Sequence, residues 1–389
     1  MTTFLDRRKF LARAGAIGCS LAASPLITPI SFAQAPWDTR LVVIILRGGM
    51  DGLDVVRPVG DPAFAALRPN LNDDAPPLPL DGYFAMHPAL APLMPLWPQQ
   101  DLGFVHAVST PYRDKRSHFD GQDLLEAGTT SLNGGSSDGW LNRLLQQMPG
   151  VAAQTAYAIG HSDLRVLNGV APVANWTPDA QLRLSPQATR LAELVMEDDP
   201  ALHAALAEAM MLSDTGNRGG KRGGRAHIKV SKFAASQLRA DARIAAFSLN
   251  GWDTHRNQRR ALTRGLGRLS ETILTLKADL GASVWGKTAI VAMTEFGRTA
   301  RENGTGGTDH GTGGLMVLAG GGIRGGQVYG DWPGVSQSAL YQGRDLMPTG
   351  DVRAPAAWIM RGLTGVDTGV LERQVFPGLD LGVDPNLLK

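Results

Sequence analysis

The sequence predicts an α/β fold, a doubly wound and mostly parallel sheet with helices on both faces. Two observations carry this prediction. Several short runs are apolar at almost every position, as strands buried on both faces of a sheet are. Between them lie longer segments with apolar residues at helical spacing, so that strands and helices alternate as they do in parallel α/β sheets.

The predicted strands are the short apolar runs. The first of them has no alternation of polar and apolar residues, which is typical of a strand covered on both faces. The runs cover residues 40–46, 102–107, 156–160, 243–249, 288–293 and 315–319.

Helices are predicted between these strands. The clearest runs from Leu262 to Leu280, where leucine or isoleucine recurs at three- and four-residue steps and forms one apolar stripe. Residues 57–100 are rich in proline, asparagine and aspartate, and we interpret them as loops with short helices. Further helices are expected over residues 117–127, 140–148, 184–211 and 229–241.

The first 35 residues have the pattern of a twin-arginine export signal. Arg7 and Arg8 precede a weakly apolar segment, and Ala33 and Ala35 form a small-x-small cleavage site. The glycines, serines and prolines of that segment make it a poor permanent membrane span. We therefore expect export by the twin-arginine machinery to the periplasm or the extracellular space, with removal of residues 1–35. An uncleaved membrane anchor is the alternative.

Composition limits what the mature chain can bind. The whole chain has 38 basic and 36 acidic residues, and the signal contains four and one of them, which leaves 34 and 35 and a net charge of −1. This balance indicates neither nucleic acid nor an anionic membrane as a partner. Cys19 is the only cysteine and lies in the signal, so the mature chain has no disulfides and no thiolate ligands.

We expect residues 36–389 to form one α/β domain with a flexible loop near 213–226. This loop contains a glycine- and arginine-rich stretch that superficially resembles an RNA-binding repeat. It has no interleaved aromatic residue and occurs once, so a solvated loop is the preferred interpretation.

Carboxylates and imidazoles gather at the predicted edge of the sheet. Ligands of open parallel sheets bind beyond the carboxyl ends of the strands. Three polar segments directly follow buried strands, and a fourth directly precedes the last one. Each residue taken alone has a structural alternative as a turn residue, a helix cap or half of an ion pair. Together the segments supply Asp51, Asp253, His255, Glu295, Asp309 and His310.

Oxygen and nitrogen ligands without sulfur predict a divalent metal site. Imidazole favours Zn or Mn, while Ca or Mg would suit the carboxylates. Such an ion polarises a phosphoryl or sulfuryl oxygen and lowers the pKa of an attacking hydroxyl. Arg298 is a candidate for holding an anionic oxygen with two hydrogen bonds.

Five motifs occur in order along the mature chain: LRGGMDG (46–52), RSHFD (116–120), GWDTH (251–255), EFGRT (295–299) and DHG (309–311). They resemble the signature segments of an exported family called domain of unknown function 1501, which is similar to the alkaline phosphatase and sulfatase superfamily. The resemblance implies a hydrolase of phosphate or sulfate esters that uses one or two metal ions, on an alkaline-phosphatase-like sheet.

The resemblance also implies roles for single residues. Asp51 corresponds to the first metal carboxylate. Asp253 and His255 correspond to the Asp-and-His pair of one metal site, and His310, beside Asp309, to the late histidine ligand.

One departure from the superfamily pattern concerns the second metal. Glu295 stands where the superfamily usually has an aspartate followed by histidine, and Phe296 replaces that histidine. This substitution weakens the second metal site. It also favours an alternative function, a non-catalytic binding or assembly protein on a degenerate sulfatase-like scaffold.

The nucleophile of the superfamily lies at the start of the helix after the second strand. Ser117 occupies about that position, where a helix N-terminus favours an anion. The alternative is a helix cap, because Ser117 and Asp120 approximate a capping box. His118, next to it, is a candidate ligand, proton shuttle or histidine nucleophile.

Overall fold

The computed structural model describes residues 37–71, 75–113, 116–131, 138–160, 164–178 and 225–389, which belong to one compact unit of the chain. The predicted export signal, the helix over 184–211 and nearly all of the loop over 213–226 lie outside these ranges. Within these ranges, no helix combines the length and the apolar character needed to cross a bilayer.

The centre of the fold is a sheet that counts nine strands within the described residues. β1 (Arg40–Arg47) lies between β8 (Ile244–Asn250) and β9 (Thr288–Met293), and it is parallel to both. The other strands are β5 (Leu102–Ser109), β6 (Ala156–Ile159), β7 (Ala174–Trp176), β10 (Gly314–Ala319), β11 (Val328–Tyr329) and β12 (Gly350–Asp351). Their order is β11-β5-β10-β9-β1-β8-β6-β7, and β12 also pairs with β5.

β10 runs against the other strands. It pairs antiparallel with both β5 and β9, whereas the remaining pairs of the sheet are parallel. The prediction of a mostly parallel sheet is therefore confirmed. Because β10 is reversed, the residues before it lie at the same edge of the sheet as the residues after β1, β8 and β9. This explains why one predicted site segment precedes its strand.

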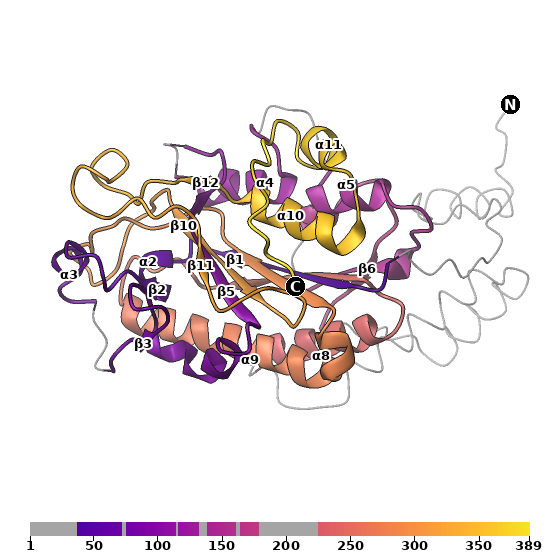
Figure 1. The fold of residues 1–389 in the computed structure, drawn as a ribbon, viewed down its shortest axis with the longest axis horizontal. Coiled ribbons are helices and arrows are strands. Elements are labelled where there is room, and N and C mark those ends of the chain that lie inside the picture. Colours follow the sequence, from indigo (N-terminus) through magenta and orange to yellow (C-terminus); the bar gives the residue numbers. More distant parts are fainter. Residues whose placement is uncertain (1–36, 72–74, 114–115, 132–137, 161–163, 179–224) are drawn as a thin grey trace, which may run out of the picture. The chain divides into compact units, whose positions relative to one another are not determined.

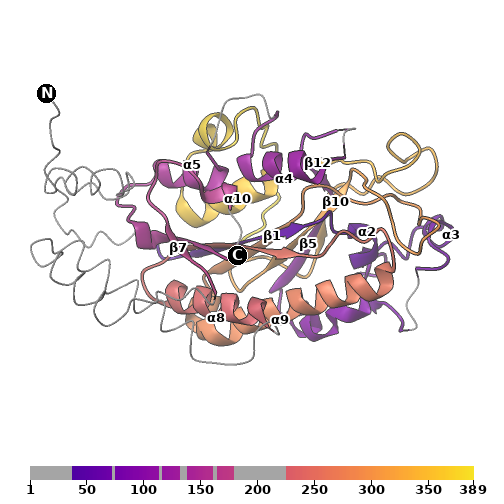
Figure 2. The same ribbon diagram turned by 180° about the vertical axis from the view of Figure 1, so that it is seen from behind.

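Helices cover both faces of the sheet (Figure 1). α4 (His118–Ala127), α5 (Trp140–Gln146) and α10 (Arg353–Thr364) lie on one face. α8 (Ala226–Arg239) and α9 (Gln258–Trp285) lie on the other. The view from behind shows the same two layers (Figure 2). The doubly wound arrangement is thus confirmed.

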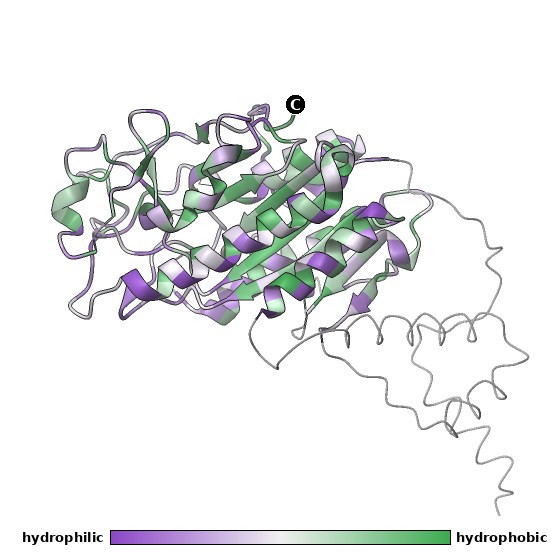
Figure 3. Ribbon diagram, turned by 90° about the horizontal axis from the view of Figure 1, so that it is seen from below, coloured by the Kyte–Doolittle hydropathy of each residue, from purple (hydrophilic) through white to green (hydrophobic). Residues whose placement is uncertain are grey.

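The strands are apolar because both of their faces are covered. Residues 41–46 of β1 are at most 4% exposed. On α9 the predicted stripe is buried against the sheet, including Leu262, Leu269 and Ile273. Burial of each such side chain contributes about 1.5–3 kcal/mol. In Figure 3 the strands are mostly green, whereas the covering helices mix purple, white and green.

Short elements connect these layers. A small sheet pairs β4 (Ala85–Met86) with β2 (Val56–Arg57) and β3 (Leu78–Pro79). The short helices are α2 (Gly52–Val55), α3 (Phe64–Leu67), α11 (Thr368–Val370), the 3-10 helices η1 (Pro88–Leu96), η2 (Ala153–Thr155) and η3 (Arg165–Leu167), and the π-helix η4 (Leu371–Val375).

Candidate metal centre

Loops from distant parts of the chain meet where β1, β8 and β9 end and β10 begins. The loop after β8 carries Asp253 and His255, and the loop before β10 carries His310. The turn after β1 packs directly against the first of these loops. Gly48 has a φ of 125°, and an added Cβ would lie 2.5 Å from the backbone nitrogen of Asp253. Only glycine therefore permits this approach.

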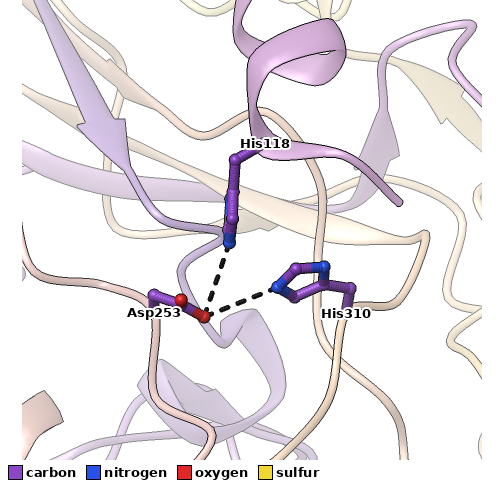
Figure 4. Close-up of side chains that lie close together, drawn as sticks. All are labelled: His118, Asp253 and His310. Carbon is purple, nitrogen blue, oxygen red and sulfur yellow. Dashed lines mark ion pairs between the residues drawn. The ribbon is translucent and has the colours of Figure 1, made fainter. Parts of the chain in front are cut away.

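His118, Asp253 and His310 point toward one another (Figure 4). The Nε2 atoms of His118 and His310 lie 3.4 and 3.5 Å from Oδ1 of Asp253. The two imidazole rings meet edge to face, with centroids 4.2 Å apart. One ligand atom from each of the three residues lies within 4.8 Å of the others. His255 stands beside this cluster, with its Nε2 3.1 Å from the same Asp253 oxygen.

The Nε2 atom of His118 is buried and has no hydrogen-bond partner within the described part of the chain. Leaving such an atom unsatisfied costs about 1–3 kcal/mol, so the cluster favours a ligand. A tetrahedral zinc site with bonds of about 2.0–2.1 Å separates neighbouring ligand atoms by roughly 3.3 Å. The 3.4 and 3.5 Å distances to Asp253 are close to this value. The described residues thus fit a divalent ion held by two nitrogens and one oxygen.

Each of the three imidazoles is held from behind through its Nδ1 atom. A neutral imidazole that donates from Nδ1 presents the lone pair of Nε2 to the cluster. The acceptors are Glu295 Oε1 at 2.8 Å for His118, Asp309 Oδ1 at 2.9 Å for His255, and the carbonyl of Arg116 at 2.7 Å for His310. Burial lowers the pKa of His310, which favours the neutral form that a ligand requires.

Glu295 is fully buried, and its carboxylate holds His118. It also accepts hydrogen bonds from Gln122 at 3.1 Å, from the Gly48 N–H at 2.9 Å and from the Thr294 hydroxyl at 3.0 Å. Burial alone would raise the pKa of Glu295, but hydrogen bonds, led by that of His118 and including those of Gln122 and Gly48, lower it overall. In return, the hydrogen bond to Glu295 raises the pKa of His118. Glu295 therefore orients a histidine rather than belonging to the three-residue cluster.

Arg298 is a buried anchor, only 1% exposed. Its side chain donates to Asp253 Oδ1 at 2.7 Å. Burial alone would raise the pKa of Asp253, but this bond and the Arg298 charge lower it, so the carboxylate stays ionised. The remaining donors go to the backbone carbonyls of Gly48, Gly49, Trp252 and Thr308. The expectation that Arg298 holds a substrate oxygen with two hydrogen bonds does not agree with this geometry, because its guanidinium is already bonded within the protein.

Asp51 lies outside the cluster, contrary to its expected role as the first metal carboxylate. Both of its oxygens accept hydrogen bonds from Arg68, at 3.0 and 2.9 Å. Gln258 donates to it at 2.6 Å and the Thr308 hydroxyl at 3.2 Å. Arg68 neutralises the charge of Asp51, so the carboxylate stabilises the fold.

Ser117 is the N-cap residue of α4. Its hydroxyl accepts a hydrogen bond from the Asp120 N–H at 3.4 Å, and its own N–H donates to the Tyr112 hydroxyl at 2.8 Å. The capping alternative describes this geometry. A nucleophilic role for Ser117 stays a prediction.

Two supports of the cluster were missed from the sequence. Gln122 lies four residues after His118 on α4, so both face the same side and both reach Glu295. That spacing was visible in the sequence. The Arg116 carbonyl that holds His310 is a backbone group, and no side-chain pattern could have indicated it.

Comparisons with known proteins place this geometry in context. A family model described as Protein of unknown function (DUF1501) matches residues 107–353. No curated protein matches the chain in sequence.

Three similar solved structures share 10 to 13% sequence identity with the chain. A lipoteichoic acid synthase from Listeria monocytogenes has a TM-score of 0.41 at 10% identity, over 88% of this chain and 76% of that one. An alkaline phosphatase from the Antarctic bacterium TAB5 has a TM-score of 0.37 at 10% identity, over 74% and 91%. A protein in the alkaline phosphatase superfamily from Vibrio parahaemolyticus has a TM-score of 0.37 at 13% identity, over 84% and 72%. Likenesses this weak support no conclusion about activity.

Proposed function

This chain belongs to the family described as Protein of unknown function (DUF1501), as its motifs predicted, and we propose that it is an exported, metal-dependent hydrolase of phosphate or sulfate esters. One observation carries the metal-dependent part of the proposal. The buried Nε2 of His118 has no hydrogen-bond partner within the described residues and faces Asp253 and His310. Zn or Mn suits this donor set best.

Three protein ligands are the number that catalytic zinc sites use, because a fourth position then remains for water or substrate. An ion bound here supplies a Lewis acid and lowers the pKa of a bound water. Asp253 contributes the negative charge of the ligand set, and Arg298 keeps that carboxylate ionised. Glu295 fixes the ring of His118 so that Nε2 faces the other two ligands.

His255 is suited to move a proton. Its side chain is 39% exposed, against 23% for His118 and 19% for His310, so it is the most open of the three imidazoles. Asp309 accepts the bond from its Nδ1, and its Nε2 lies 2.9 Å from Nε2 of His310 and 3.1 Å from Oδ1 of Asp253. The Nε2 atom therefore faces the cluster, where it can exchange a proton with a substrate oxygen bound there. The proposal assigns His255 the role of acid and base, with Asp309 as its positioning residue.

The ester class and the export step rest on the sequence. The five motifs resemble those of a family similar to phosphatases and sulfatases, which are hydrolases of anionic esters. Residues 1–35 have the features of a twin-arginine signal, so we place the working protein in the periplasm or outside the cell.

A second candidate is a binding or assembly protein without hydrolase activity. Phe296 favours it, because this side chain is buried and stacks on His118 with ring centroids 5.1 Å apart. An apolar ring thus occupies the position at which the superfamily resemblance calls for a second-metal histidine.

Metal titration tests the proposal. Protein stripped with a chelator is expected to bind Zn²⁺ or Mn²⁺ in isothermal titration calorimetry, and His310→Ala is expected to lower the affinity more than about 100-fold, which exceeds the usual effect of losing an outer partner. His227→Ala is the matched control, because His227 also pairs with a carboxylate, Glu271, but lies on α8. Equal affinities of the His310→Ala variant and the starting protein would reject the site.

A substrate screen separates the two candidates. Phosphate and sulfate monoesters and diesters are offered to the metal-loaded protein, with His310→Ala as the inactive reference. Hydrolysis that depends on His310 supports the enzyme. Tight metal binding with no turnover of any ester supports the binding protein instead.

A further inference from the structure

A hollow of about 520 Å³ lies at the start of α9, and its wall contains Arg256, Arg259, Arg260 and Arg264. We propose that this hollow binds a second phosphate or sulfate group of the substrate, so that the substrate is a polyanionic chain rather than a lone monoester. The inference rests on the proposed function, since the ester that is cleaved would lie at the neighbouring cluster.

Three arginine side chains at the hollow are exposed and available to bind an anion. Arg260 and Arg264 are four residues apart on α9, which places them on one side of the helix, and Arg256 lies in the loop just before the helix begins. All three are exposed, and none of them makes an ion pair or a side-chain hydrogen bond with another described residue. Planar guanidinium groups bind phosphate and sulfate oxygens with two parallel hydrogen bonds.

The helix end adds to this positive potential. Asn257, at the N-cap of α9, makes no side-chain capping bond, and the first turn contains no acidic residue. The positive end of the helix dipole, which acids usually neutralise, is therefore surrounded by arginines instead. Like charges four residues apart repel one another on a helix, so the stripe does not help α9 to fold. An anionic ligand removes that repulsion.

The hollow and the metal cluster share their connecting segments. Arg256 directly follows His255, the proposed acid and base. Asn303 donates to the His255 carbonyl at 3.0 Å and to Asp309 at 3.1 Å, while Gly306, three residues later, lines the hollow. A chain molecule with one anionic group in the hollow would therefore lie next to the groups that act on another.

A binding experiment tests this inference without any measurement of hydrolysis. Zinc-loaded protein is titrated with fluorescent dextran sulfate, with polyphosphate and with neutral dextran of the same length. We expect the two anionic polymers to bind and the neutral one not to bind, and the tighter of the two to identify the ester group. Arg260→Gln together with Arg264→Gln should weaken binding roughly tenfold and lower the slope of log affinity against log salt by about two.

The matched control removes two positive charges elsewhere. Lys232→Gln together with Arg239→Gln changes exposed residues of α8 and should leave the affinity within about twofold. Equal losses in the two double variants would overturn the proposal, because bulk charge would then explain the binding. Thermal unfolding curves that coincide show that both variants are folded.

The sequence also offers a competing occupant. Asp73 and Asp74, outside the described residues, come soon after Leu71, which lines the hollow. Binding that appears only after Asp73→Asn and Asp74→Asn would mean that the chain fills its own hollow, and the proposal would fail. Failure of the ester screen with intact polymer binding would reject the hydrolase alone. Ester hydrolysis without polymer binding would reject this inference alone.

Discussion

The Asp51 network and the Asp253 cluster begin from similar residues, yet their bonding differs. In the first, Arg68 bonds both oxygens of Asp51, and Arg57 pairs with the neighbouring Asp54 at 2.8 Å. In the second, one oxygen of Asp253 faces three imidazoles and Arg298, and a buried nitrogen of His118 has no hydrogen-bond partner among the described residues. Buried charge alone therefore does not identify a functional site. The Asp253 cluster differs because its buried nitrogen without a partner faces other atoms that can bind a metal.

The two regions are also connected. Thr308 donates from its hydroxyl to Asp51, and its carbonyl accepts a bond from Arg298, which holds Asp253. Thr308 is therefore bonded to both regions. If the Asp51 network serves stability and the Asp253 cluster serves function, the two properties should separate in variants.

The largest effect is expected in the Asp51 network. Arg68→Ala should lower the free energy of unfolding by about 3–5 kcal/mol, because Asp51 would remain as a buried charge without its partner. Urea unfolding measures this loss. Arg301→Ala, which removes an exposed arginine, should change stability by less than about 0.5 kcal/mol. A loss of zinc affinity in folded Arg68→Ala protein would contradict the division.

The next largest effect is expected at His106, a buried histidine whose two ring nitrogens both have hydrogen-bond partners. Burial lowers the pKa of His106 to about 4, and its ring donates from Nε2 to the Val56 carbonyl and accepts the Ala107 N–H at Nδ1. The unfolded chain takes up this proton below about pH 6.5 and the folded chain only below about 4. Stability is therefore lost as pH falls through this window, by up to about 3 kcal/mol.

The variant His106→Gln keeps a donor for Val56 but cannot titrate. The difference in unfolding free energy between the starting protein and the variant should shrink as pH falls from 7 to 4, because other groups contribute equally to both. A difference that stays constant with pH would show that His106 is not held neutral.

The smallest effect is expected at the open side of the cluster. Asp309→Asn should lower kcat/KM for a hydrolysed ester roughly 10- to 100-fold, because the amide no longer fixes the tautomer of His255. The loss of kcat/KM should be smaller than for removal of His255 itself. Asp367→Asn, a change at the exposed cap of α11, is the control and should leave kcat/KM unaltered. Unchanged turnover in Asp309→Asn would remove the proposed role of His255.

Much of the fold could be predicted from the sequence, because burial on both faces requires continuous apolar strands. The orientation of β10 could not be predicted, since residues 315–319 are equally apolar in either direction. Asp51 illustrates a second limit. A glycine-rich turn with aspartate suits both a helix cap and a metal ligand, and the partner that decides between them, Arg68, lies in a segment without regular spacing.

The candidate site could be predicted in part, for a related reason. Parallel strands bring their carboxyl ends together, so the gathering of Asp253, His255 and His310 followed from topology. The direction in which each carboxylate points did not. Glu295 and Asp309 accept hydrogen bonds from the Nδ1 atoms of histidines, and only the packed loops decide which acid faces the cluster and which faces an imidazole.

The reversed strand β10 has a consequence for synthesis of the protein. β10 fills the gap between β5 and β9 and brings His310 to a cluster whose other members precede it in the chain. A ribosome-bound polypeptide that has not yet released this region contains His118 and Asp253 but no closed set of donors. An ion held by all three residues could therefore bind only after the chain has been synthesised through His310 and β10 has paired with β5 and β9.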